Sequence, residues 1–231
     1  MPAAQSDEAD LRERFFQAIE RGDREQVVEM LAAQPTLASA RNDKCVSATL
    51  YSLYYREPEI AELLASSGAE LTVFEAAALG RVETLRGLLA SDGSRANTVA
   101  SDGFSPLGLA AFFGQPETAR LLLEHGADAN AVSQNAMRVA PLHSAVAAQR
   151  LDIAEDLLRA GAQVNAAQAD DFTPLHQAAQ NGQVAMIELL LAHGADLHAR
   201  KSDGQTALDV AQAHGKDAAA ALLRERAANA G

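Results

Sequence analysis

The chain contains a sequence unit that recurs in register, and this feature constrains the fold more than any other. Residues 104–131 read FSPLGLAAFFGQPETARLLLEHGADANA, and residues 172–199 read FTPLHQAAQNGQVAMIELLLAHGADLHA. Residues 139–166 carry a third copy, VAPLHSAVAAQRLDIAEDLLRAGAQVNA, and residues 205–226 a shorter fourth. Recurrence at a period of about 33 residues predicts a solenoid, in which each unit covers its apolar side on its neighbours.

The residues of one copy have clear physical roles. Thr173 can cap a helix whose first position is Pro174, where a missing N–H is harmless. The alanine pair at 178–179 lets neighbouring helices approach closely. Gly182 supplies the turn between two helices, and Gly194 ends the second helix in left-handed geometry. Each copy therefore predicts a pair of helices joined by a tight turn.

This pattern resembles the ankyrin repeat. The matching residues are Thr173, Pro174, Leu175, His176, Ala178, Ala179, Gly182, Leu189, Leu190, Gly194, Ala195 and Asp196. The resemblance implies an all-α repeat solenoid of about seven helix-turn-helix units, with short β-hairpin fingers and degenerate terminal caps. The alanine-rich composition suggests a bacterial source.

The inter-helix turn position gives the phasing of the repeats. It falls at Gly22, Arg56, Gly80, Gly114, Gln149, Gly182 and Gly215. We expect a flexible tail over residues 1–10 and one ankyrin domain over residues 11–231. Its repeats are predicted near 11–41, 42–70, 71–99, 100–132, 133–167, 168–200 and 201–231.

Two repeats depart from the regular length. The third is short by about nine residues, so the finger that should precede its helices is missing. The fifth has a finger two residues longer than its counterparts, with Met137 and Arg138 near the tip. A change of length in a surface connection costs little, so the long finger can also be incidental.

Composition and charge restrict the class of protein. With 48% apolar residues, no run long enough to span a membrane and no signal peptide, a soluble cytoplasmic protein is expected. Cys45 is the only cysteine, so no intrachain disulfide forms. The net charge of −12 disfavours nucleic acid and anionic membranes, and suits a neutral or basic protein partner.

In the ankyrin family, the two residues after the alanine pair project onto the concave face, as does the residue before the Thr-Pro opening. Tyr54 and Tyr55 in the second repeat and Phe112 and Phe113 in the fourth form two aromatic groups, which flank a low saddle of Ala78 and Leu79. Helix spacing predicts that the groups lie roughly 20 Å apart, as the walls of a peptide groove. The predicted partner-binding residues are Tyr54, Tyr55, Leu79, Phe104, Phe112, Phe113, Met137 and Arg138.

A second interpretation of the tyrosines stays open. The second repeat is degenerate, with Ser52 and Leu53 in place of the alanine pair. Tyr51 could fill the space left by the missing finger, with Tyr54 or Tyr55 helping. These side chains would then be core rather than groove.

The sequence shows no catalytic constellation. The ankyrin resemblance implies that His143 and His176 bond to neighbouring backbone, and no metal-binding or nucleophile motif appears. We therefore predict a non-catalytic protein-protein interaction module without cofactors, which binds a partner protein or peptide on its concave face. A self-associating scaffold is the alternative, and a small-ligand sensor is a third. A monomer is expected, with a dimer as the other outcome.

Overall fold

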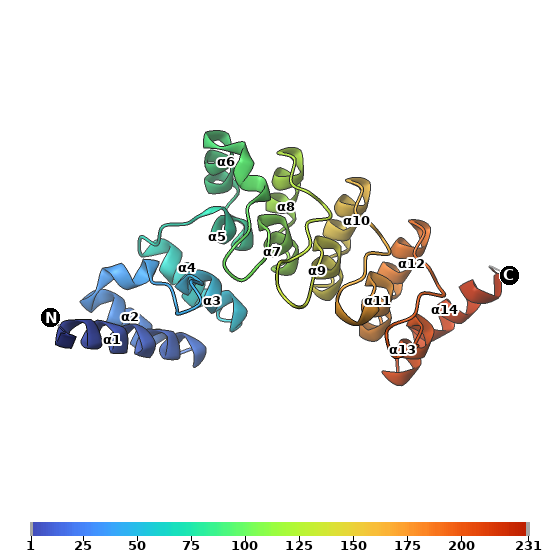
Figure 1. The fold of residues 1–231 in the computed structure, drawn as a ribbon, viewed down its shortest axis with the longest axis horizontal. Helices are drawn as coiled ribbons and strands as arrows, with labels where there is room; N and C mark the ends of the chain where they lie inside the picture. Colours follow the sequence, from blue (N-terminus) through green and yellow to red (C-terminus); the bar gives the residue numbers. More distant parts are fainter. Residues whose placement is uncertain (1, 230–231) are drawn as a thin grey trace.

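The computed structural model describes residues 2–229, which form a curved array of paired helices (Figure 1). The first helices of the pairs are α1 (Pro2–Glu20), α3 (Ala48–Tyr54), α5 (Val73–Ala78), α7 (Pro106–Phe112), α9 (Pro141–Ala147), α11 (Pro174–Asn181) and α13 (Ala207–Ala213). The second helices are α2 (Arg24–Ala33), α4 (Pro58–Ser66), α6 (Val82–Ser91), α8 (Pro116–Glu124), α10 (Leu151–Arg159), α12 (Val184–Ala192) and α14 (Asp217–Asn229). Short 3₁₀ turns lie at Pro35–Ser39, Gly93–Asn97 and Ala169–Asp171. The predicted all-α repeat solenoid is confirmed.

Local signals place the helices where the sequence predicts them. The Thr173 hydroxyl accepts a hydrogen bond from the His176 N–H, and Pro174 opens α11. The seven predicted inter-helix turns all have left-handed backbone: Gly22 (φ 66°), Arg56 (63°), Gly80 (70°), Gly114 (70°), Gln149 (60°), Gly182 (72°) and Gly215 (64°). The phasing is therefore confirmed. Residues 2–10, where a tail was expected, lie within α1.

The apolar core is divided between the second and third pairs. One cluster runs from Phe15 to Leu64, and a larger one runs from Val73 to Leu223. A small third cluster joins them, with Val46, Leu50, Ala78 and Leu109 at its centre. The array therefore consists of a two-pair block and a five-pair block with a narrow apolar joint.

The missing finger of the third repeat is evident in the structure. Residues 67–72 connect α4 directly to α5, whereas residues 92–105 connect α6 to α7. Figure 1 shows α6 separated from α4, unlike the closely spaced second helices that follow. An ion pair between Arg81 and Glu62 crosses this break. The outer layer of helices is thus interrupted at the same place as the core.

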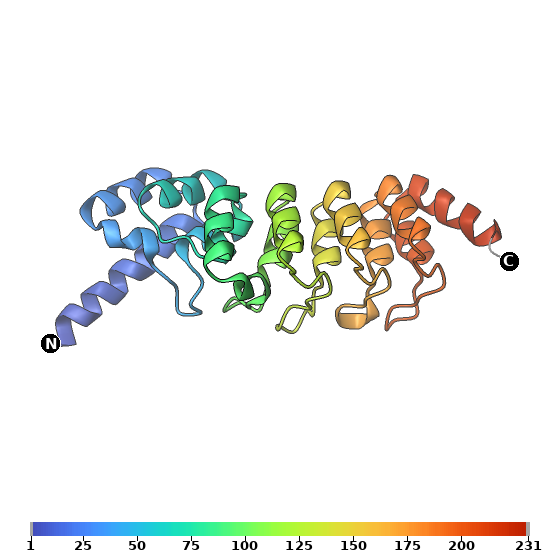
Figure 2. The ribbon, with the colours of Figure 1, turned by 90° about the horizontal axis from the view of Figure 1, so that it is seen from above.

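The fingers all project from one side of the array (Figure 2). They differ from the predicted β-hairpins, because residues 2–229 contain no strand and a single isolated bridge, between Arg41 and Ser47. Each finger closes on two or three backbone hydrogen bonds, too few for a ladder. Neighbouring fingers are joined by single backbone bonds, such as the one from the Ser202 N–H to the Asp170 carbonyl (3.0 Å).

Two buried histidines tie the helices to the fingers. Nε2 of His143 lies 3.1 Å from the Phe172 carbonyl, and Nε2 of His176 lies 3.2 Å from the Gln205 carbonyl. Each ring thus reaches the finger of the following repeat. The structural role predicted for both histidines is confirmed. Burial lowers the pKa of His143 to about 4, although its hydrogen bond to the Phe172 carbonyl acts in the opposite direction.

Arg56 and Gln149 occupy inter-helix turns whose left-handed backbone favours glycine. We expect Gln149→Gly to raise the free energy of unfolding by roughly 0.5–1 kcal/mol, because it relieves a Cβ clash. Gly215→Ala should lower it by about 1 kcal/mol, since an added Cβ meets nothing within 4 Å and only the backbone is strained. Urea unfolding followed by circular dichroism measures both. A loss of stability in Gln149→Gly would show that its side chain is needed.

Stability should fall at mildly acidic pH because of His143. The unfolded chain takes up a proton near pH 6.5, whereas the folded protein resists it down to about pH 4. This contribution is complete above pH 6.5 and is lost as the pH falls, by up to about 3 kcal/mol. The free energy of unfolding, measured with urea between pH 7.5 and 4.5, should depend less steeply on pH in His143→Gln than in the wild type. His214→Gln, at an exposed position, is the control. An unchanged slope contradicts the assignment.

Candidate functional site

The end of α3 places its tyrosines on two sides. The Tyr51 ring meets the Phe16 ring edge-on at 5.0 Å and lies 4.7 Å from the Tyr55 ring. Both hydroxyls donate to the Glu20 carboxylate, that of Tyr55 at 2.9 Å. Tyr51 therefore joins the second repeat to the first. The Tyr51 ring turns toward α1, and its side chain also packs against the small cluster around Val46, so Tyr51 belongs to the core as the second interpretation expected.

Tyr54 turns the other way. Its ring centroid lies 5.4 Å from that of Phe113 and 6.4 Å from that of Phe112, and its hydroxyl donates to Asp102 at 2.6 Å. The expected separation of roughly 20 Å between the two aromatic groups is therefore wrong. The estimate counted helix axes, whereas the long tyrosine side chain reaches across α5 at Ala78, which presents only a methyl group and is fully buried.

These aromatic side chains form one surface, which we call the aromatic band: Phe16, Tyr51, Tyr55, Tyr54, Phe112 and Phe113. The first three contact one another in sequence at the α1–α3 junction, where Phe16 is buried beneath Tyr51, and the last three contact one another across α5 in tilted or edge-on pairs. Tyr55 and Phe112 are its most open members, each 44% exposed. Tyr54 contacts both Phe112 and Phe113, and its neighbour Tyr55 contacts Tyr51, so the two aromatic groups expected on opposite sides of a groove meet.

The tyrosine hydroxyls are held as donors. The pKa values of Tyr51 and Tyr54 are raised, first by burial and then by their hydrogen bonds to Glu20 and Asp102. A carboxylate that accepts a hydrogen bond from the phenol stabilises the neutral phenol relative to the phenolate. Both carboxylates are thereby fixed at the edge of the aromatic band.

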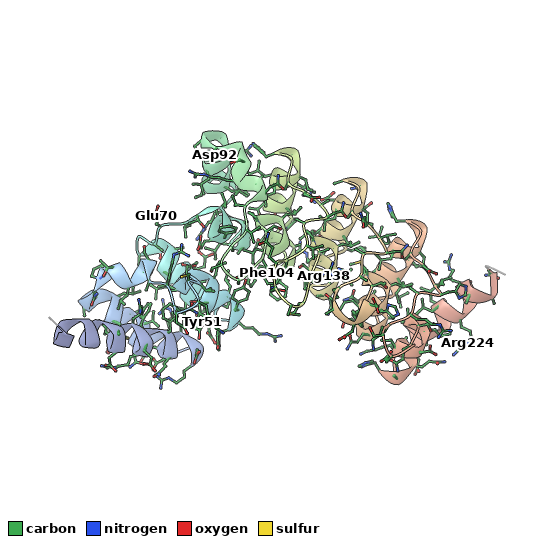
Figure 3. The ribbon with its side chains drawn as sticks, viewed as in Figure 1. Tyr51, Glu70, Asp92, Phe104, Arg138 and Arg224 are labelled. Carbon is green, nitrogen blue, oxygen red and sulfur yellow. The ribbon has the colours of Figure 1, made fainter. Side chains whose placement is uncertain are left out.

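The structure brings together only part of the predicted site. Tyr54, Phe104 and Phe113 are half-buried in the joint between the two core blocks. Leu79 is half-buried at the end of α5. Met137, 59% exposed, and Arg138 lie on the next finger, beside the one that carries Phe104 (Figure 3). Their part in binding stays a prediction.

Two acceptors that complete the site were not among the predicted residues. Glu20 ends α1, and Asp102 lies on the finger that precedes α7. Glu20 occupies the same concave position in the first repeat as Tyr54 in the second, and the phasing of the repeats already places it on that face. Asp102 could not be paired with Tyr54 from the sequence, because 48 residues separate them.

A surface hollow of about 480 Å³ adjoins the band between α1 and the finger over residues 40–47. Phe16 and Tyr51 line it together with the carboxylates of Glu13, Glu20 and Asp43 and the guanidinium of Arg12. Carboxylates thus outnumber cations in the hollow. Within residues 2–229, no three histidine, cysteine or carboxylate side chains are arranged to hold a metal ion.

Comparison with known families agrees with this geometry. The family model described as "Ankyrin repeats (3 copies)" matches residues 73–168 and 142–231. The chain belongs to the ankyrin repeat family. The matches begin at α5, so they cover the five-pair block and leave out the two degenerate pairs. No curated protein matches the chain, and no helix within residues 2–229 has the length and apolar character needed to cross a membrane.

Replacing two adjacent tyrosines one at a time distinguishes a core side chain from a surface side chain. We expect Tyr54→Ala to lower the free energy of unfolding by roughly 2–4 kcal/mol, because it opens a void against Phe113 and leaves Asp102 without its donor. Tyr55→Ala, at an exposed position, should cost about 1 kcal/mol or less. Urea unfolding of both variants tests this, and equal losses would contradict the difference in burial.

Proposed function

We propose that this ankyrin repeat protein binds a protein partner through the aromatic band on its concave face. Ankyrin repeats generally serve as protein-protein interaction modules. The observation that carries the proposal is the pair of aromatic side chains, Tyr55 and Phe112, which remain open on an otherwise well-packed aromatic surface. Aromatic side chains held rigidly by their neighbours are typical anchors of interfaces, because little conformational entropy is lost on binding.

The charge of this surface favours a basic partner. Glu20 and Asp102 lie at the edges of the aromatic band, and the adjoining hollow adds Glu13 and Asp43. A lysine or arginine side chain would meet both carboxylates and aromatic faces there. The net charge of −12 would increase the rate of encounter with such a partner.

We propose a non-catalytic role. The two buried histidines serve the fold through the Phe172 and Gln205 carbonyls. The Tyr51 and Tyr54 hydroxyls donate to carboxylates, and the pKa values of both phenols are raised, the opposite of what a nucleophile needs. Recognition is the activity that the aromatic band supports.

A double substitution tests the proposal. Tyr55→Ala/Phe112→Ala removes the two open aromatic rings, and we expect the protein to stay folded and to lose a partner captured by the wild type from cell extract. Val28→Ala/Leu151→Ala is the control, because it removes two comparably exposed apolar side chains from second helices. Retained capture by the aromatic variant, or equal loss in the control, contradicts the proposal.

The same proteins distinguish the scaffold alternative. Light scattering at micromolar concentration gives the oligomeric state of the wild type. A dimer that dissociates in Tyr55→Ala/Phe112→Ala would assign the aromatic band to self-association. A monomer in both leaves the band available to another protein.

A further inference from the structure

A cavity lies where the finger of the third repeat is missing. It has a volume of about 240 Å³ and lies between the finger over residues 40–47 and the start of the next finger, residues 99–101. Thr72, Phe74 and Glu75 of the α5 segment form its floor. We call this cavity the finger slot.

One wall of the finger slot offers a backbone donor without an acceptor. In the later fingers, the N–H of the second loop residue donates to the preceding finger: Gln134 to the Gly103 carbonyl (2.8 Å), Ala169 to Met137 (3.1 Å) and Ser202 to Asp170 (3.0 Å). Ser101 holds the equivalent position, because Ala100 closes its loop on Phe104 as Lys201 does on Gln205. Within residues 2–229 the Ser101 N–H makes no hydrogen bond, since the finger that should accept it is absent.

The floor of the slot offers an acceptor without a donor. Glu75 stands at the position that His143 and His176 hold in their repeats, and it is 1% exposed. Its Oε2 accepts from the N–H and hydroxyl of Thr72. Its Oε1 is buried and has no hydrogen-bond partner within residues 2–229. A buried polar atom left in this state has lost its hydration without gaining a hydrogen bond, so a donor there would be favourable.

The charge of Glu75 is already balanced. Nη2 of Arg41 lies 3.9 Å from Oε1, while Nη1 of Arg41 donates to the Cys45 carbonyl at 3.0 Å. A second cation would therefore compete with Arg41, whereas a neutral N–H donor would not. Arg41 is about half exposed, so it can move aside and open the way to Oε1.

We propose that the finger slot binds an extended peptide segment of a partner protein, which takes the place of the missing finger. One donor and one acceptor are the complement of a peptide backbone: a carbonyl accepts from the Ser101 N–H, and an N–H donates to Glu75 Oε1. Main-chain pairing of this kind is how added segments extend existing structure in other proteins. The slot lies among the fingers and not on the open side of the aromatic band, so this inference goes beyond the proposed function.

The chain itself supplies a suitable probe. The acetylated, amidated peptide KSDGQT repeats the finger over residues 201–206, whose Asp203 carbonyl corresponds to the Asp170 acceptor. Titration into ¹⁵N-labelled full-length protein should shift the backbone amide signals of Ser101 and of residues 72–75. Glu75→Gln removes the acceptor charge, and Ser101→Pro removes the donor. Each should raise the dissociation constant, by roughly tenfold for the hydrogen bond to the Glu75 carboxylate and by roughly fivefold for the neutral hydrogen bond from Ser101.

Two matched variants control for charge and for proline. Glu70→Gln removes an exposed carboxylate from the connection that precedes α5. Ser202→Pro places proline at the position of another finger that is equivalent to Ser101. Both variants should bind the peptide as the wild type does. Circular dichroism checks each fold, and if one slot variant fails to fold the other decides. Absence of shifts at the slot, or equal binding by all variants, overturns the proposal. Shifts confined to Tyr55 and Phe112 would also overturn it while leaving the proposed function intact.

Discussion

The structure depends on apolar packing between neighbouring helix pairs, since no pair can bury its own apolar side. Along most of the array, each first helix packs on the next first helix and each second helix on the next second helix. Two layers of helices thus hold neighbouring pairs together. At the break between α4 and α6 only the inner layer continues, and the small cluster around Ala78 and Leu109 joins the two core blocks. The coupling between the two blocks therefore rests on a few side chains there.

This joint explains why all three tyrosines lie together. Tyr51 secures α3 to α1 through Phe16, and Tyr54 secures it to α7 through Phe113, while Tyr55 remains open. An aromatic ring suits such a place because it spans a wide contact and its hydroxyl can end on a carboxylate at the surface. The rings that hold the joint also form the base of the proposed binding surface. In the proposed mode of binding, recognition and stability share the same side chains, and Tyr55 and Phe112 are the most exposed of them.

The missing finger both removes contacts and leaves polar groups unpaired at the same place. Its loss interrupts the outer layer and the row of finger-to-finger hydrogen bonds, and it leaves Ser101 and Glu75 with complementary unused groups. A regular array would have satisfied both internally, as His176 and Ser202 do. The irregular repeat therefore places a donor and an acceptor, both unpaired within residues 2–229, beside the same slot.

The sequence by itself determined the repeat, its phasing and the ends of the helices, because capping residues, glycines and the alanine pair act within a few residues of one another. Even Arg56 and Gln149 were placed correctly at inter-helix turns, which the structure shows to have left-handed backbone, since their neighbours impose the turn. Only the tertiary structure decided where the tyrosine rings point, because Tyr54 meets Phe113 and Asp102 through packing across α5. The same holds for Glu75, whose lack of a donor becomes visible only when the neighbouring fingers are in place. Contacts of this kind depend on the shape of the gap between helices, which local signals do not encode.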